Sequence, residues 1–205
     1  MNISIIKYGM GNVASVQKAI NKLGYKSVLT NNRDEIIQSD FILLPGVGSF
    51  KKGIENLSDS GLVDFLTEEV VYNKKPFLGI CLGMQLLAKL GNEPNKVEGL
   101  GWIDGEVIKI PNEYKVPHLG WNNVYSSNKK NEWYDEFNNV DFYFIHGYYF
   151  NAFSENDISL TVDYNMNMVA GLQKDNIYAC QFHPEKSQDA GLRYLKKIIG
   201  SYVKV

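Results

Sequence analysis

The sequence contains one stretch, Pro76-Phe77-Leu78-Gly79-Ile80-Cys81-Leu82-Gly83-Met84-Gln85, that predicts an apolar strand followed at once by a helix. The helix is expected to continue through Leu90 and to end at Gly91. Glycines at 79 and 83 bracket the cysteine, and such small neighbours allow a sharp turn that lifts a nucleophile out of a sheet. A helix N-terminus also favours a thiolate and lowers its pKa. The alternative is a buried structural cysteine, and this stretch alone supports both interpretations equally.

Apolar strands alternate with helical patterns in the first half of the chain. Strands are predicted at residues 3–6, 26–30, 41–44 and 77–80, with helices at 13–23 and 61–72 between them. This alternation is typical of an α/β fold with a doubly wound, mostly parallel open sheet. Later strands at 102–110, 122–125, 140–146, 158–164, 168–172 and 177–182 predict an antiparallel or mixed extension of the sheet. An exposed loop is expected at 126–132 and a closing helix at 189–203. Residues 1–205 contain no evident linker, so a single domain is expected.

Composition narrows the classes of function. The 205 residues are 44% hydrophobic and 21% charged, as in globular proteins, and the formal net charge is −2. That charge gives no electrostatic reason to expect binding to nucleic acid or to an anionic membrane surface. The N-terminal apolar run is too short for a signal peptide, and no run approaches a membrane span. We therefore expect a cytoplasmic protein with two free thiols, Cys81 and Cys180.

A glycine-rich segment, Pro45-Gly46-Val47-Gly48, follows the third predicted strand. Ligand sites in open α/β sheets form beyond the carboxyl ends of the strands, where Cys81 is also expected. Backbone N–H groups of residues 46–48, together with the N–H of Leu82, would suit an oxyanion hole. Taken alone, the tetrapeptide is better explained as an ordinary turn.

The last predicted strand leads into His183-Pro184-Glu185. A residue before proline favours extended backbone, and residues i and i+2 of an extended chain point to the same side. Glu185 could therefore orient the His183 ring and leave its other nitrogen for Cys81. A surface turn explains these three residues alone, but the combination with Cys81 and the glycine-rich segment indicates acyl transfer through a thioester. No metal or cofactor is expected, because three histidines and two distant cysteines offer no closely spaced ligand pair.

The chain resembles the class I glutamine amidotransferases, and within them the glutaminase subunits of imidazole glycerol phosphate synthases. The motifs that carry this resemblance span almost the whole chain: Tyr8-Gly9-Met10-Gly11-Asn12, Leu44-Pro45-Gly46-Val47-Gly48-Ser49-Phe50, Gly79-Ile80-Cys81-Leu82-Gly83-Met84-Gln85, Pro117-His118-Leu119-Gly120-Trp121-Asn122, Tyr143-Phe144-Ile145-His146 and Gln181-Phe182-His183-Pro184-Glu185-Lys186-Ser187.

The resemblance implies that Cys81 attacks the carboxamide of L-glutamine, with His183 as base and Glu185 as its orienting partner. It places glutamine beside Gly46, Val47, Gly48, Leu82, Gln85, Gly147 and Tyr148. It also implies a heterodimer with a (β/α)₈-barrel synthase subunit, which would receive the ammonia and form imidazole glycerol phosphate in histidine biosynthesis. The implied interface residues are Pro117, His118, Trp121, Asn122, Tyr143 and Lys186. From the residues alone, Trp121 would be explained by packing and Lys186 by solvation.

Two positions depart from the family pattern. Lys7 stands where an acidic residue is common, and Gly147 replaces a usual Ser or Thr. Neither change removes a catalytic group, but both leave room for a paralogous glutaminase that supplies another acceptor, such as amidination of a cell-surface sugar. A stand-alone hydrolase or peptidase built on the cysteine turn, and a non-catalytic binding subunit, are less favoured alternatives.

Overall fold

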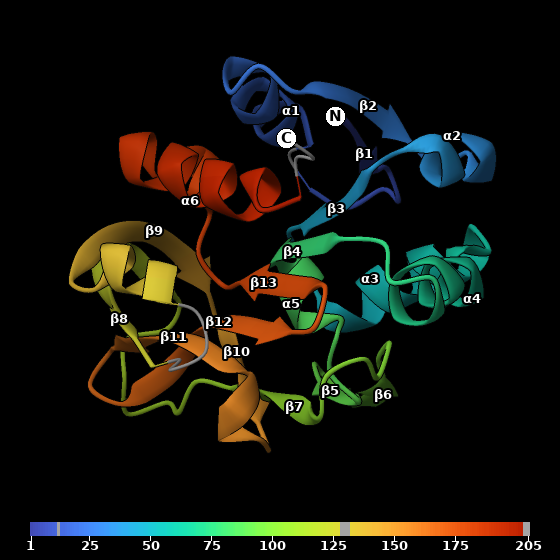
Figure 1. Ribbon diagram of the computed structural model, residues 1–205. Helices are drawn as coiled ribbons and strands as arrows, with labels where there is room; N and C mark the ends of the chain where they lie inside the picture. Colours follow the sequence, from blue (N-terminus) through green and yellow to red (C-terminus); the bar gives the residue numbers. More distant parts are fainter. Residues whose placement is uncertain (12, 128–131, 203–205) are drawn as a thin grey trace.

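A computed structural model describes residues 1–11, 13–127 and 132–202. Within this part of the chain the main sheet has nine strands (Figure 1). In spatial order they are β2 (Lys26–Thr30), β1 (Asn2–Ile6), β3 (Phe41–Gly46), β4 (Phe77–Cys81), β13 (Ile177–Cys180), β12 (Asn167–Lys174), β11 (Ile158–Asp163), β8 (His118–Ser126) and β9 (Val140–His146). Neighbours from β2 to β13 pair parallel, and neighbours from β13 to β9 pair antiparallel. The predicted mixed extension is confirmed.

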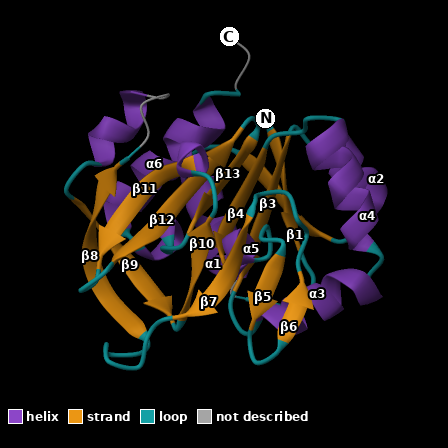
Figure 2. Cartoon of the chain, turned by 90° about the horizontal axis from the view of Figure 1, so that it is seen from below, coloured by secondary structure: helices purple, strands orange, loops and turns teal. Residues whose placement is uncertain are grey.

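Helices cover both faces of this sheet (Figure 2). Successive strand residues point to opposite faces, so Phe41 and Leu43 share a core with α1 (Val13–Lys22) and α6 (Gln188–Gly200). Ile42 and Leu44 pack instead with α2 (Arg33–Gln38), α3 (Phe50–Asp59) and α4 (Leu62–Thr67). No helix of the described residues is long and apolar enough to cross a membrane.

The segment after Cys81 differs from its prediction. Helix α5 (Leu82–Gln85) is one turn long, and tighter bonds from the Leu87 and Ala88 N–H groups to carbonyls three residues earlier close it. Gly91 is no helix cap: it lies in β5 (Leu90–Asn92), where any side chain would collide with the Phe50 ring. Strand β5 belongs to a second sheet with β10 (Tyr148–Ala152), β7 (Gly105–Lys109) and β6 (Lys96–Glu98). Residues 86–88 are apolar and buried, and this apolar run directly after α5 resembles the continuation of a helix.

Other boundaries also shift. Helices α2 and α3 were not predicted, although Asn32 and Ser49 cap their N-termini through side-chain oxygens. The predicted helix at 61–72 becomes α4 followed by a π-helix, Glu68–Tyr72. A 3₁₀-helix, Glu132–Phe137, follows the predicted loop at 126–132, most of which (128–131) lies outside the described residues, as do Asn12 and the expected helix end at 203.

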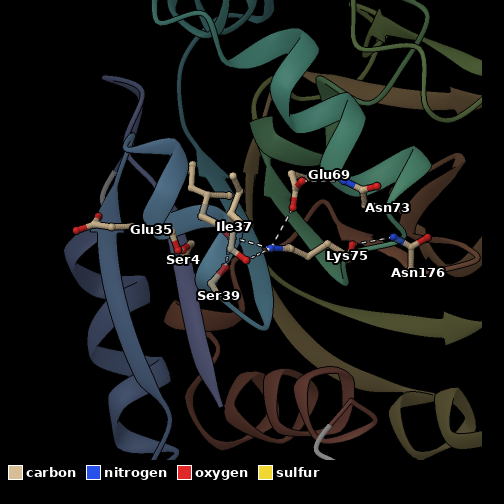
Figure 3. Close-up of polar contacts among 9 residues, drawn as sticks. Ser4, Glu35, Ile37, Ser39, Glu69, Asn73, Lys75 and Asn176 are labelled. Atoms are coloured by element: carbon tan, nitrogen blue, oxygen red, sulfur yellow. Dashed lines mark hydrogen bonds and ion pairs between the residues drawn. The ribbon is translucent and has the colours of Figure 1, made fainter.

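Lys75, just before β4, contacts α2, the π-helix and the turn between β12 and β13 (Figure 3). Its ammonium group donates to the Ile36 and Ile37 carbonyls at the end of α2, at 2.8 and 2.7 Å, and pairs with Glu69 of the π-helix at 3.1 Å. Asn176, between β12 and β13, donates to the backbone carbonyls of Val70 and Lys75. These contacts use every polar group that Lys75 offers, so we assign the cluster a structural role.

Candidate active site

Cys81 occupies a strained turn at the centre of the sheet. Its backbone has φ 54° and ψ −107°, a conformation that non-glycine residues rarely adopt outside functional turns. Gly83 permits this turn because a Cβ there would collide with the Leu44 carbonyl oxygen, and a Cβ at Gly79 would lie 2.7 Å from the Gly83 carbonyl oxygen. The predicted strand–turn–helix around the cysteine is therefore present.

The glycine-rich segment lies beside the cysteine. Strand β3 continues through Pro45 to Gly46, two residues further than predicted, and its register places Gly46 opposite Cys81 on β4. Gly46 is buried against the Tyr8 hydroxyl, so only glycine fits there, whereas Val47 and Gly48 are exposed. Gly48 has φ +115°, a conformation that side chains disfavour. The segment thus brings exposed backbone to the edge of the cysteine turn.

His183 and Glu185 form a buried pair after β13. His183 Nδ1 lies 2.8 Å from Glu185 Oε1, and both side chains are at most 3% exposed. The expected contact is present, but its backbone differs: His183 is extended, whereas Glu185 lies in a 3₁₀-turn, Pro184–Lys186. Burial alone would lower the pKa of His183, but the neighbouring Cys81 and Glu185 outweigh burial and raise it to about 9. His183 Nε2 has no hydrogen-bond partner among the described residues.

Gln85 reaches from α5 across the site to two other segments. Its side-chain amide donates to the Tyr148 carbonyl at 2.8 Å and to Gln181 Oε1 at 3.0 Å. Gln181 Nε2 in turn lies 3.6 Å from Cys81 Sγ. Gly147, between β9 and β10, is half-buried and accepts a bond from the Ile110 N–H through its carbonyl. The structure therefore brings Gln85 and Tyr148 together with Cys81.

A second buried histidine pair lies behind Tyr148. His146 Nδ1 donates to the Tyr148 carbonyl at 2.9 Å, which leaves His146 Nε2 to accept from His118 Nδ1 at 2.9 Å. Asn122 then donates to His118 Nε2 at 2.6 Å. Burial lowers the pKa of His118 to about 4, and burial with repulsion from His118 lowers that of His146 to about 3. Both rings are therefore neutral at pH 7.

The strands β8 and β9 present an exposed apolar surface. Leu119 and Trp121 of β8 lie opposite Ile145 and Tyr143 of β9, and the first three are 56, 44 and 39% exposed, respectively. We call these four residues the β8–β9 patch. Pro117, which follows a cis peptide bond, is exposed at the start of β8. The Lys186 ammonium lies 5.7 Å from the Tyr143 ring centre.

One predicted interface side chain is not at the surface. His118 is fully buried and stacked between Phe144 and Tyr164, with ring centres 4.6 and 4.0 Å away. Along β8 its side chain points inward while Leu119 points outward, so the exposed-interface prediction for His118 is corrected. His118 Nε2 instead accepts a hydrogen bond from Asn122, which is half-buried and reaches the surface.

Sequence reasoning missed three side chains at this site: Gln181, His146 and Tyr8. Gln181 and His183 are two residues apart, so the alternation used for His183 and Glu185 would have placed Gln181 on the same side. His146 ends one of the motifs that carry the resemblance, but its residue type and position alone gave it no role. The Tyr8 hydroxyl is buried beside Gly46 without a hydrogen-bond partner among the described residues, which the sequence does not indicate.

Comparisons with known proteins agree over nearly the full length. Residues 4–199 match the family described as "Glutamine amidotransferase class-I". The imidazole glycerol phosphate synthase subunit HisH 2 of Methanococcus maripaludis is 42% identical over 199 residues, covering 96% of this chain and 98% of the relative. HisH 1 of Campylobacter jejuni is 45% identical over 197 residues, covering 95% and 97%. A crystal structure of a glutamine amidotransferase aligns with TM-score 0.76 at 17% identity, covering 96% and 98% of the two chains. PurLQS from Thermotoga maritima aligns with TM-score 0.74 at 16% identity, covering 99% of both chains.

Proposed function

This chain belongs to the class I glutamine amidotransferase family, and from that premise we propose that it is the glutaminase subunit of an imidazole glycerol phosphate synthase in histidine biosynthesis. The whole chain would serve as one glutaminase domain in a cytoplasmic heterodimer. The observation that carries the proposal is the buried His183–Glu185 pair beside the strained Cys81 turn, in a chain whose relatives are named as subunits of that synthase.

The proposed reaction uses Cys81 as the nucleophile and His183 as the proton carrier. His183 takes the thiol proton, and Cys81 Sγ forms a bond to the carboxamide carbon of glutamine. The C–N bond then breaks, and the nitrogen leaves as ammonia with the proton that His183 held. Water loses a proton to His183 and attacks the thioester, the C–S bond breaks, the proton on His183 returns to the sulfur, and glutamate is released. Glu185 keeps the His183 ring in one orientation throughout.

Substrate binding is assigned to the groups around the cysteine. Backbone N–H groups of residues 46–48 and of Leu82 would stabilise the tetrahedral oxyanion, since Gly46 lies opposite Cys81 in the sheet. Gln85, Gly147 and Tyr148 would line the glutamine site, because the Gln85 amide and the Tyr148 carbonyl already meet within hydrogen-bond distance of each other.

The barrel subunit is proposed to bind the β8–β9 patch. Its large exposed apolar side chains on two paired strands are typical of a protein interface, with Pro117, Asn122 and Lys186 at its margin. Trp121→Ala is expected to raise the Kd of the complex at least about tenfold, because tryptophans that become buried on binding often dominate the affinity of an interface. Tyr72→Ala serves as the control: it removes an aromatic ring of the π-helix that is 69% exposed, more than the 44% of Trp121, and should leave Kd unchanged.

The decisive experiment combines this protein with the barrel subunit and its ribonucleotide substrate. We expect glutamine-dependent formation of imidazole glycerol phosphate that Cys81→Ala abolishes while synthesis from added ammonia persists. Cys180→Ala removes the other thiol and should retain activity. Glutamine-dependent synthesis by Cys81→Ala would refute the nucleophile assignment.

A paralogous glutaminase for another acceptor is the second candidate. It is favoured by Lys7, exposed at the carboxyl end of β1, and by Gly147 at the proposed glutamine site. Relatives numbered HisH 1 and HisH 2 are in keeping with such paralogues. Glutaminase activity that an active histidine-pathway barrel fails to stimulate would select this candidate over the first.

A further inference from the structure

Gln181 lies between the nucleophile and the glutamine site. It follows β13 directly, is fully buried, and its backbone N–H is held by the Ala170 carbonyl at 2.9 Å. Phe182 points away and stacks on Phe142, with ring centres 4.1 Å apart. Gln181 and His183 therefore project to the same side of the chain, toward Cys81, from a backbone that is fixed on both sides.

The hydrogen bonds around Gln181 have only one consistent direction. The Tyr148 carbonyl can only accept, so the end of the Gln85 amide that faces it is the NH₂ group. The same NH₂ group also contacts Gln181, so that end of the Gln181 amide is its oxygen. The other end of Gln181, which faces Cys81 Sγ at 3.6 Å, is consequently its NH₂ group and donates to the sulfur.

This donor is separate from the proton carrier. The Cys81 sulfur interacts with the His183 ring, whose pKa it raises, and Gln181 Nε2 supplies a second contact to the sulfur, an amide N–H donor at 3.6 Å. An amide N–H bond to sulfur is stronger when the sulfur carries a charge, because charge-assisted bonds are about twice as strong as neutral ones. An amide also neither gains nor loses a proton near pH 7, so it can hold the sulfur while the imidazole protonates the leaving group.

We propose that Gln181 is a positioning residue that orients the Cys81 sulfur, favours its thiolate and links it through Gln85 to the glutamine site. The proposal rests on the proposed role of Cys81 as nucleophile. It assigns to Gln181 a task distinct from the proton transfer of His183, because the Gln181 amide donates to the sulfur without gaining or losing a proton.

Alkylation of Cys81 by iodoacetamide tests the proposal without requiring turnover. The rate is measured against pH, since only the thiolate reacts. Gln181→Leu is expected to lower the rate at pH 7 about tenfold by moving the midpoint of the profile up by about one pH unit. Gln181→Glu should move it further, because its carboxylate repels a thiolate. Cys81 raises the pKa values of its titratable neighbours Tyr8, Cys180 and His183, and these three residues, with Glu185 beside His183, are retained in the Gln181 variants.

Three controls separate positioning from general loss of structure. Asn176→Ala removes another buried amide, which donates to the Val70 and Lys75 carbonyls (Figure 3 draws the bond to Lys75), and should lower the melting temperature without moving the profile. Cys81→Ser identifies the alkylated residue, since Cys180 is 0% exposed and should not react, whereas Cys81 is 6% exposed. Gln85→Leu removes the donor that holds Gln181 Oε1. It should also move the midpoint to higher pH and lower the alkylation rate at pH 7 by about threefold.

An unchanged profile in folded Gln181→Leu overturns the proposal, and so does an unchanged profile in Gln85→Leu if the Gln181 variants do not fold. Neither result affects the nucleophile assignment, which fails only if Cys81→Ala retains glutamine-dependent synthesis. The two ideas can therefore fail independently.

Discussion

His183 lies beside the Cys81 thiol and the Glu185 carboxylate, whereas the hydrogen bonds of the His118 and His146 rings join them to each other, to the Asn122 amide and to a carbonyl group. All three histidines of the chain are buried, and burial by itself lowers the pKa of each. The acidic neighbours reverse this effect at His183 alone. Burial therefore does not determine the charge of a histidine here. The neighbouring groups do, and they separate His183, whose pKa is raised, from a buried pair whose pKa values are lowered.

Replacing His183, the histidine whose pKa is raised, should have the largest effect. His183→Gln keeps a side chain that can bond Glu185 but cannot carry a proton, so glutamine-dependent synthesis should fall about 10³-fold. Synthesis from added ammonia by the same complex should be unchanged. Comparable losses in both assays would point to damaged folding or assembly instead.

Acid tests the neutral pair. His118 and His146 have a pKa of 6.5 in the unfolded chain but pKa values of about 4 and about 3 in the folded chain. As the pH falls below 6.5, the unfolded chain therefore binds more protons than the folded chain and is favoured. His183 acts in the opposite sense, because its folded pKa is raised and its contribution is lost as pH rises through about 9. The net free energy of unfolding should fall by about 3 kcal/mol between pH 7 and pH 5. Urea titrations at several pH values measure it, and a flat profile would contradict the neutral pair.

Glu185→Gln should make the pKa of His183 more like those of His118 and His146. Without the carboxylate, the pKa of His183 should move down toward those of the buried pair, and glutamine-dependent synthesis should fall about 10²-fold. NMR titration of the imidazole reports the shift directly. A drop in activity with an unmoved pKa would show that Glu185 orients the ring without favouring its charge.

Asn122→Ala should have the smallest effect, on the pair alone. It removes the donor to His118 Nε2 and should lower the free energy of unfolding by about 1 kcal/mol. Asn123→Ala is the matched control, because this neighbour on β8 bonds the exposed Asn139 and should cost less than about 0.5 kcal/mol. Equal losses in a denaturation series would argue against a buried line of hydrogen bonds.

The sequence predicted the parts of the site that depend on local backbone. The glycines around Cys81 and the spacing of His183 and Glu185 indicate a turn and a pair, and the structure contains both. Contacts between distant segments could not be predicted in this way. Gln181 meets Cys81 across 100 positions of the chain, and the burial of His118 depends on Phe144 and Tyr164. The length of α5 was also misjudged, because residues buried on all sides lose helical periodicity.

The position of β13 between β4 and β12 has a consequence for the timing of synthesis. Cys81 leaves the ribosome about a hundred residues before Gln181 and His183, and β13 must insert into the middle of a sheet whose other strands precede it. A growing chain therefore carries the Cys81 turn before His183 and Gln181 can reach it. If His183 is the proton carrier that we propose, a truncated product that lacks β13 and His183 hydrolyses no glutamine and releases no ammonia.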